Sequence, residues 1–108
     1  MHNFRQLDIW KESMALAKKT YITTDGFPTE ERFGLTSQLR RCCVSIPSNI
    51  AEGSSRNSSK EFAYFLRVAL GSSFELETQL TLANEVGFIA SDELTELNKQ
   101  IIVIQKKK

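Results

Sequence analysis

Residues able to carry catalysis are scarce in this chain. Its one histidine, His2, lies at the amino end, and its two cysteines, Cys42 and Cys43, are sequence neighbours. A zinc site needs further Cys or His ligands at a set spacing, and a di-metal carboxylate site in a helical bundle needs Glu-x-x-His pairs. Glu75 and Glu77 stand two residues apart, so on a helix they diverge. We therefore expect a protein that is not an enzyme and binds no metal or cofactor.

The adjacent thiols allow two interpretations. Arg40 and Arg41 precede them and could lower a thiol pKa, which is how redox-sensing cysteines are activated. Free cysteine is also among the most frequently buried residue types, and a small core residue is the simpler interpretation. We favour the second interpretation for Cys42 and Cys43.

The strongest candidates for ligand binding are basic. An anion-binding surface would use Arg40, Arg41, Arg56 and Lys60, with Arg67 nearby. Arg56 and Lys60 flank a predicted helix start, where free N–H groups and the helix dipole favour phosphate. The alternative is a solvated basic face with weak surface ion pairs. Two neighbouring residues differ by about 100° around a helix, so we expect Arg40 and Arg41 to face different surroundings.

Composition limits the classes of protein that fit. The chain has 108 residues, 41% of them hydrophobic, which suits one domain spanning residues 1–108. The formal net charge of +1 gives no global attraction to nucleic acid, so any such binding must come from local charge. No apolar run approaches the ~20 residues of a membrane span, and no signal peptide opens the chain. We expect a cytoplasmic protein with reduced thiols and no membrane association.

Hydrophobic spacing predicts helices throughout. The first runs from about Phe4 to Thr23 and the second from about Leu35 to Ala51. Pro47 predicts a kink or break in the second helix, and Gly53 predicts its end. The first helix's predicted apolar stripe consists of Leu7, Trp10, Met14, Ala17 and Tyr21.

The second half of the chain predicts two more helices. Ser58 and Glu61 form a capping box that begins a long helix, from about Ser59 to Val86. Ser91 or Asp92 caps the fourth. The predicted seam of the long helix consists of Phe62, Leu66, Ala69, Ser73, Leu76, Leu80 and Ala83. Short connections favour antiparallel neighbours, so the predicted fold is all-α, an up-down-up-down four-helix bundle.

Small and polar residues suggest contacts between helices or between copies. Gly71, Ser72 and Ser73 interrupt the long helix, which favours close helix crossing over a ligand pocket. A second apolar set on the same helix (Ala63, Leu70, Phe74) suggests a subunit interface. Our candidates for interface or packing are Ser48, Asn49, Glu52, Gly71, Ser72 and Phe74.

Several blocks carry a family resemblance. They are GLTSQLRR (34–41), SIPSNIAEG (45–53), EFAYFL (61–66) and GSSFELETQL (71–80). The chain resembles the four-helix-bundle proteins encoded in intervening sequences of bacterial 23S ribosomal RNA genes, and is similar to the accessory variability determinant protein of diversity-generating retroelements. Cys42-Cys43 departs from the alanines more usual in the family, which supports the core interpretation.

The resemblance implies an antiparallel bundle that assembles as a ring, commonly a homopentamer, with no established enzymatic activity. It supplies no binding residues, so Arg40, Arg41, Arg56 and Lys60 remain our own candidates. The leading hypothesis is a ring-forming bundle that binds structured RNA or a nucleoprotein partner. The alternative is a purely structural or protein-binding module with no nucleic-acid role.

Overall fold

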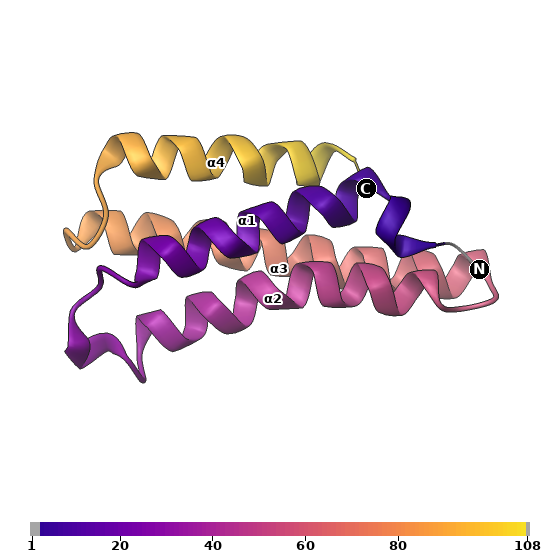
Figure 1. Cartoon of the computed structure of the whole chain (residues 1–108), viewed down its shortest axis with the longest axis horizontal. Coiled ribbons are helices and arrows are strands. Elements are labelled where there is room, and N and C mark those ends of the chain that lie inside the picture. The colour runs from indigo at the N-terminus through magenta and orange to yellow at the C-terminus, as the bar shows by residue number, and fades with distance from the viewer. Residues whose placement is uncertain (1–2, 108) are drawn as a thin grey trace.

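The computed structural model describes residues 3–107, and over these residues the chain folds into four long helices. The helices are α1 (Asp8–Thr24), α2 (Leu35–Ser54), α3 (Ser59–Glu85) and α4 (Ser91–Lys106), with short 3-10 turns at Phe4–Gln6 and Thr29–Glu31. Successive helices run in opposite directions along the long axis (Figure 1). Helices α1 and α3 each pack on both α2 and α4. The predicted all-α bundle is confirmed.

Helix α1 starts later than predicted. Asn3 caps a 3-10 turn by accepting a hydrogen bond from the backbone N of Arg5, and Leu7 is extended, so the α-helix begins at Asp8. The predicted stripe was also partly wrong, because Met14 and Tyr21 are exposed. The buried positions of α1 are Ser13, Leu16, Ala17, Thr20, Thr23 and Thr24.

Buried hydroxyls explain the error in the α1 stripe. Ser13 Oγ donates to the carbonyl of Trp10, and Thr20 Oγ1 donates to the carbonyl of Leu16, both at 2.9 Å. A hydroxyl that is bonded to its own helix can enter the core without an unpaired donor. Polar residue types therefore occupy positions where a hydropathy pattern expects only apolar ones.

Helix α2 continues where the sequence predicts interruption. Pro47 lies inside the helix and is buried, so a break at this position is wrong, and the helix ends at Ser54, one residue after the predicted Gly53. An internal proline costs a helix about 3 kcal/mol. Ile46 and Ile50, both fully buried on either side of it, supply packing that offsets this cost.

Gly53 serves close packing inside the hairpin of α2 and α3. A Cβ on Gly53 would lie 2.7 Å from the Cβ of Phe65 and 3.0 Å from Cδ1 of Phe62. Gly71 is the reverse case, because a Cβ there would meet nothing within 4 Å. The predicted close crossing at Gly71 is therefore wrong within this chain, while Ser72 beside it is buried as packing requires.

Helix α3 follows the sequence prediction most closely. Ser58 Oγ accepts a hydrogen bond from the backbone N of Glu61 at 3.0 Å, which confirms Ser58 as the N-cap of this helix. The helix ends at Glu85, one residue before the predicted Val86, and Gly87 follows with a φ of 85°. Most of the predicted seam is buried, and Phe62 and Leu66 at its start are half-buried. Of the second apolar set, only Phe74 is exposed.

A side chain of α3 holds the connection that leads into α4. Ala90 is its N-cap and offers no side-chain cap, so neither Ser91 nor Asp92 caps it as predicted. Instead, Asn84 Nδ2 donates to the carbonyl of Ile89 and to Ser91 Oγ, and these two hydrogen bonds stabilise the connection between α3 and α4.

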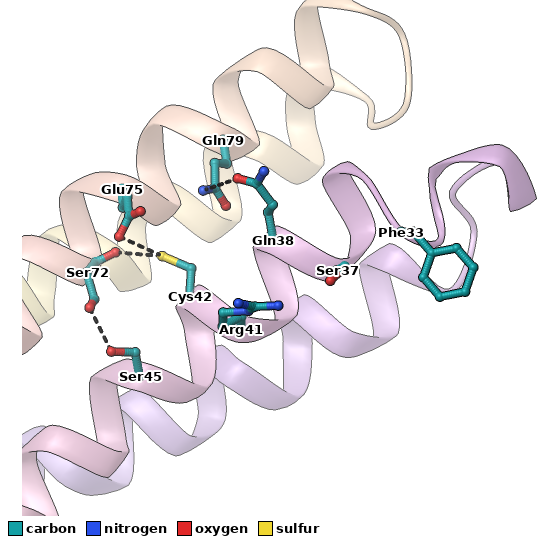
Figure 2. A pocket seen from close by; sticks show the side chains of 9 residues that line it. All are labelled: Phe33, Ser37, Gln38, Arg41, Cys42, Ser45, Ser72, Glu75 and Gln79. Atoms are coloured by element: carbon teal, nitrogen blue, oxygen red, sulfur yellow. Dashed lines mark hydrogen bonds between the residues drawn. The ribbon is translucent and has the colours of Figure 1, made fainter.

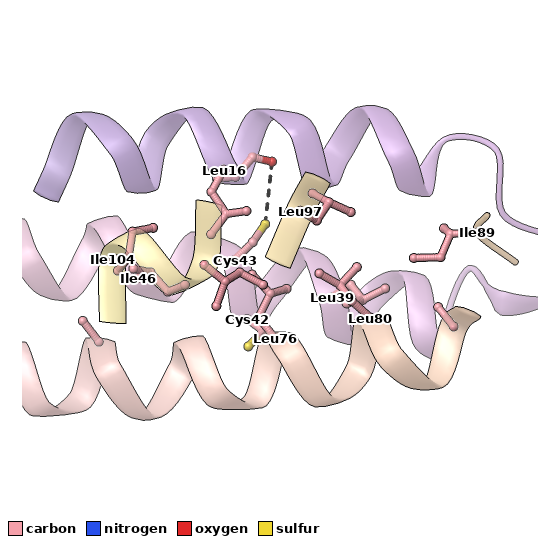
Figure 3. Close-up of a cluster of buried hydrophobic side chains, with 14 of the residues drawn as sticks. Leu16, Leu39, Cys42, Cys43, Ile46, Leu76, Leu80, Ile89, Leu97 and Ile104 are labelled. Atoms are coloured by element: carbon pink, nitrogen blue, oxygen red, sulfur yellow. Dashed lines mark hydrogen bonds between the residues drawn. The ribbon is translucent and has the colours of Figure 1, made fainter. Parts of the chain in front are cut away.

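The core lies along the bundle axis and draws on all four helices (Figure 3). Its fully buried apolar side chains are Leu16 of α1, Leu39, Cys43, Ile46 and Ile50 of α2, Leu76, Leu80 and Ala83 of α3, and Leu97 and Ile101 of α4. With the core occupied by apolar and self-bonded side chains, candidate sites lie on the outside of the bundle.

Candidate functional site

A hollow of about 420 Å³ lies near the turn between α2 and α3. It is lined by three cations, two aromatic rings and one carboxylate, namely Arg56, Lys60, Arg67, Tyr64, Phe65 and Glu61. The capping box places Lys60 in the first turn of α3, and the helical repeat then brings Tyr64 and Arg67 onto the same side. We call this group the basic hollow.

Arg56 forms a fixed wall of the basic hollow. Its Nη2 pairs with Glu52 Oε2 at 2.7 Å, and its guanidinium lies 5.0 Å from the ring centre of Phe65. The buried Nε of Arg56 has no hydrogen-bond acceptor among the described residues. The carboxylate of Glu52 thus offsets much of the positive charge of Arg56.

Lys60 and Arg67 are the available cations of the basic hollow. Within residues 3–107, neither has an ion-pair partner within 4.0 Å, and both are exposed. Glu61, the acid nearest to Lys60, accepts from its own capping partner Ser58 at 3.3 Å. The side chains of Lys60 and Arg67 can therefore bind an external anion.

Tyr64 is the exposed aromatic residue of the hollow. The residue is 54% exposed. Its ring meets that of Phe65 edge to face, with centroids 5.1 Å apart. Helical spacing could have identified this group, because Tyr64 follows Lys60 by four residues and precedes Arg67 by three.

The arginine pair on α2 separates as expected. Arg40 turns toward α1, where Nε donates to Thr24 Oγ1 at 2.9 Å, Nη2 pairs with Asp25 at 3.2 Å, and the guanidinium lies 4.7 Å from the ring centre of Tyr21. Arg40 thus clamps α1 to α2. Arg41 is exposed and lines a separate groove beside α3, so neither arginine joins the basic hollow.

Arg41 belongs to a polar groove of about 450 Å³ between α2 and α3 (Figure 2). Cys42 Sγ donates to the carbonyl of Ser72 at 3.0 Å, and the hydroxyls of Ser45 and Ser72 are 2.8 Å apart. Asn49 Nδ2 extends this set of hydrogen bonds by donating to the carbonyl and hydroxyl oxygens of Ser45. The groove wall is thus held by contacts between the two helices.

The thiols show no sign of activation. Burial raises the pKa of Cys42 to about 12, with the carboxylate of Glu75 contributing, and burial raises the pKa of Cys43 to about 11. Both thiols are free and buried. A nucleophilic or redox-sensing cysteine needs a lowered pKa and access, so the structure favours the core interpretation.

We expect these thiols to resist labelling and to weaken the fold at alkaline pH. Unfolded thiols ionise near their ordinary pKa of 9.0, whereas the folded ones retain their protons. The two protonated thiols should make their full contribution to the free energy of unfolding below pH 9, and this free energy should fall as the pH rises toward 11. N-ethylmaleimide should label the thiols in urea and barely in native buffer.

A Cys42→Ala/Cys43→Ala variant is the control for the alkaline effect, because it should lose this part of the pH dependence. Native labelling as fast as labelling in urea would contradict the expectation.

The remaining sequence candidates fall in different places. Ser48 is exposed on α2, while Phe74 and Gly71 are exposed on α3, with 52% of Phe74 accessible. Among the described residues, no group of three or more His, Cys, Asp or Glu side chains could hold a metal ion. His2 lies outside them. No helix in residues 3–107 is both long and apolar enough to cross a bilayer.

Comparison with known proteins identifies a family and a similar fold. The sequence profile described as 23S rRNA-intervening sequence protein matches residues 5–107. Among solved structures, the fold is similar to a protein of unknown function from the S23 ribosomal protein family of Bacteroides thetaiotaomicron. That match has a TM-score of 0.82 and 24% identity, over 92% of this chain and 93% of that one. Among curated proteins, no sequence matches.

Proposed function

Because the chain belongs to the family of 23S rRNA-intervening sequence proteins, we propose that it is a non-enzymatic cytoplasmic bundle that assembles as a ring and binds structured RNA, free or within a nucleoprotein. One observation supports RNA binding above the others. Lys60 and Arg67 flank an exposed tyrosine in a hollow and have no ion-pair partner among residues 3–107. Nucleic-acid affinity comes largely from such cations, which displace counterions from phosphates.

Ring assembly would compensate for the small charge of each subunit. A net charge of +1 provides little attraction on its own. A ring repeats the basic hollow around its axis, five times in the pentamer that the family resemblance implies. Linked weak contacts then raise the overall affinity by increasing the effective concentration.

The salt dependence of binding tests this function. We expect the affinity for a fluorescent RNA hairpin to fall linearly with salt on logarithmic axes, because binding releases counterions. Lys60→Ala/Arg67→Ala should weaken binding and reduce the slope by about two for each subunit that contacts the RNA, one for each phosphate that the subunit no longer binds. Fluorescence anisotropy across a salt series measures both quantities.

The matched control is Lys11→Ala/Lys18→Ala, which removes two charges from exposed positions of α1. It should leave the slope closer to that of the unmodified protein. Binding without salt dependence, or an unchanged slope in the Lys60→Ala/Arg67→Ala variant, would remove the proposed function.

A second candidate function is a module that binds only protein, and Gly71 favours it. A glycine in mid-helix costs about 1 kcal/mol relative to alanine, and a Cβ on Gly71 would meet no atom of residues 3–107 within 4 Å. Close approach of another chain would explain it. This candidate predicts an assembled protein that binds no RNA at any salt concentration.

A further inference from the structure

The ring of Tyr64 contacts Phe65 and is still partly exposed. Its edge-to-face contact with Phe65 has an interplanar angle of 82°. In such a pair, either the edge of Tyr64 faces Phe65 or only one face of Tyr64 is covered. At least one face of Tyr64 is therefore free of Phe65, consistent with its 54% exposure. Phe65 is itself held beneath the guanidinium of Arg56.

The two available cations stand on either side of this ring. Lys60 lies one helical turn before Tyr64 and Arg67 about one turn after it, so the three share a stripe about 10 Å long. Of the nearby acids, Glu52 forms an ion pair with Arg56, and Glu61 accepts a hydrogen bond from Ser58 but keeps its negative charge. An aromatic face between two cations matches a base with a phosphate on each side of it.

We infer that the basic hollow binds unpaired nucleotides, with a base stacked on Tyr64 and flanking phosphates bound by Lys60 and Arg67. The inference rests on the RNA binding proposed above and specifies its ligand. In a duplex the base faces are covered by neighbouring pairs, and only unstacked bases of loops, bulges and single strands can reach an aromatic side chain. Every base has such a face, so the site selects strandedness over sequence.

The test compares one RNA strand in two states. A fluorescein-labelled RNA of about 12 nucleotides, within the range that single-strand binding folds cover, is titrated alone and annealed to its complement. We expect the single strand to bind about tenfold tighter. Tyr64→Leu keeps an apolar side chain but removes the ring, and should lower single-strand affinity about tenfold while leaving duplex affinity and the salt slope unchanged.

Two controls make the result specific. Tyr64→Phe retains the stacking face and should bind the single strand like the unmodified protein. Size exclusion with light scattering should show the same mass for all variants, which separates loss of stacking from loss of assembly. A Tyr64→Leu variant that changes mass is replaced by Tyr64→His, which keeps a smaller aromatic face and should bind between the two.

Each failure has a different meaning. Equal affinity for both RNA states, or full single-strand affinity in Tyr64→Leu, overturns the stacking inference while the salt-dependent function stands. No binding of either RNA by the unmodified protein overturns the proposed function and this inference together.

Discussion

Replacing Gly53 with alanine is expected to destabilise the bundle by about 2 to 3 kcal/mol, near the upper end of the range for overpacked positions. The new Cβ would lie 2.7 Å from the Cβ of Phe65 and 3.3 Å from the backbone oxygen of Phe62. Neither atom is the end of a flexible side chain, so α2 and α3 must move apart. Urea unfolding followed by circular dichroism measures the change.

Gly71→Ala is the matched control, since it makes the same substitution in a helix with open space. The new methyl group meets nothing within 4 Å, so alanine should stabilise the isolated subunit by up to about 1 kcal/mol. The two substitutions thus have opposite expected signs. A Gly53→Ala variant as stable as the unmodified protein would show that the hairpin adapts without cost.

These two glycines also show where sequence reasoning reaches its limit. The sequence predicts a close helix crossing at Gly71, whereas the structure places the close contact at Gly53, next to the end of α2. A missing Cβ is visible in any sequence. Whether a neighbour fills the space depends on how two helices cross, which is set by packing along their whole length.

The helices themselves were predictable because their signals are local. The capping box at Ser58 and Glu61 involves residues three apart, and it placed the start of α3 correctly. Pro47 is also a local signal, but tertiary packing overrides it. The register of α1 was missed because Ser13 and Thr20 satisfy their hydroxyls within the helix, an interaction that residue type alone does not reveal.

The sequence predicted which cations are candidates for the site, but it did not predict which of them form ion pairs and hydrogen bonds within the chain. The sequence named these cations, and Lys60 is exposed and has no ion-pair partner among residues 3–107. Arg40 has the same charge, yet Thr24 and Asp25 engage it from a different helix and the turn that follows it. Nothing in the local sequence of Arg40 indicates that these partners would be supplied, because they lie 15 or more residues away and depend on how α1 and α2 pack.

Substituting Phe74 with glutamate is expected to dissociate the proposed ring. Phe74 and Leu82 are each about half exposed on the outer side of α3, with Gly71 one turn before Phe74 and Thr78 one turn after it. We call Gly71, Phe74, Thr78 and Leu82 the α3 outer face, and we propose that it contacts a second copy of the chain in the ring. Aromatic anchors of this kind commonly contribute about 2 kcal/mol or more to association.

Phe74→Glu removes the aromatic anchor and also places a carboxylate in the proposed interface. Burying that charge adds a desolvation cost to the loss of the ring, so the association constant should fall by about thirtyfold or more. Light scattering after size exclusion should show the mass of one subunit for Phe74→Glu. Circular dichroism should be nearly unchanged, because the side chain lies outside the core.

Ile22→Glu is the matched control for Phe74→Glu, because it places the same charge at a more exposed apolar position of α1 and should leave the ring intact. Gly71→Ala gives an independent check of the same face. If a neighbouring backbone approaches Gly71, alanine must weaken assembly while it stabilises the subunit, a combination that no effect within one chain produces. A ring that persists in Phe74→Glu, or an unmodified protein with the mass of one subunit, would rule out this assignment of the α3 outer face.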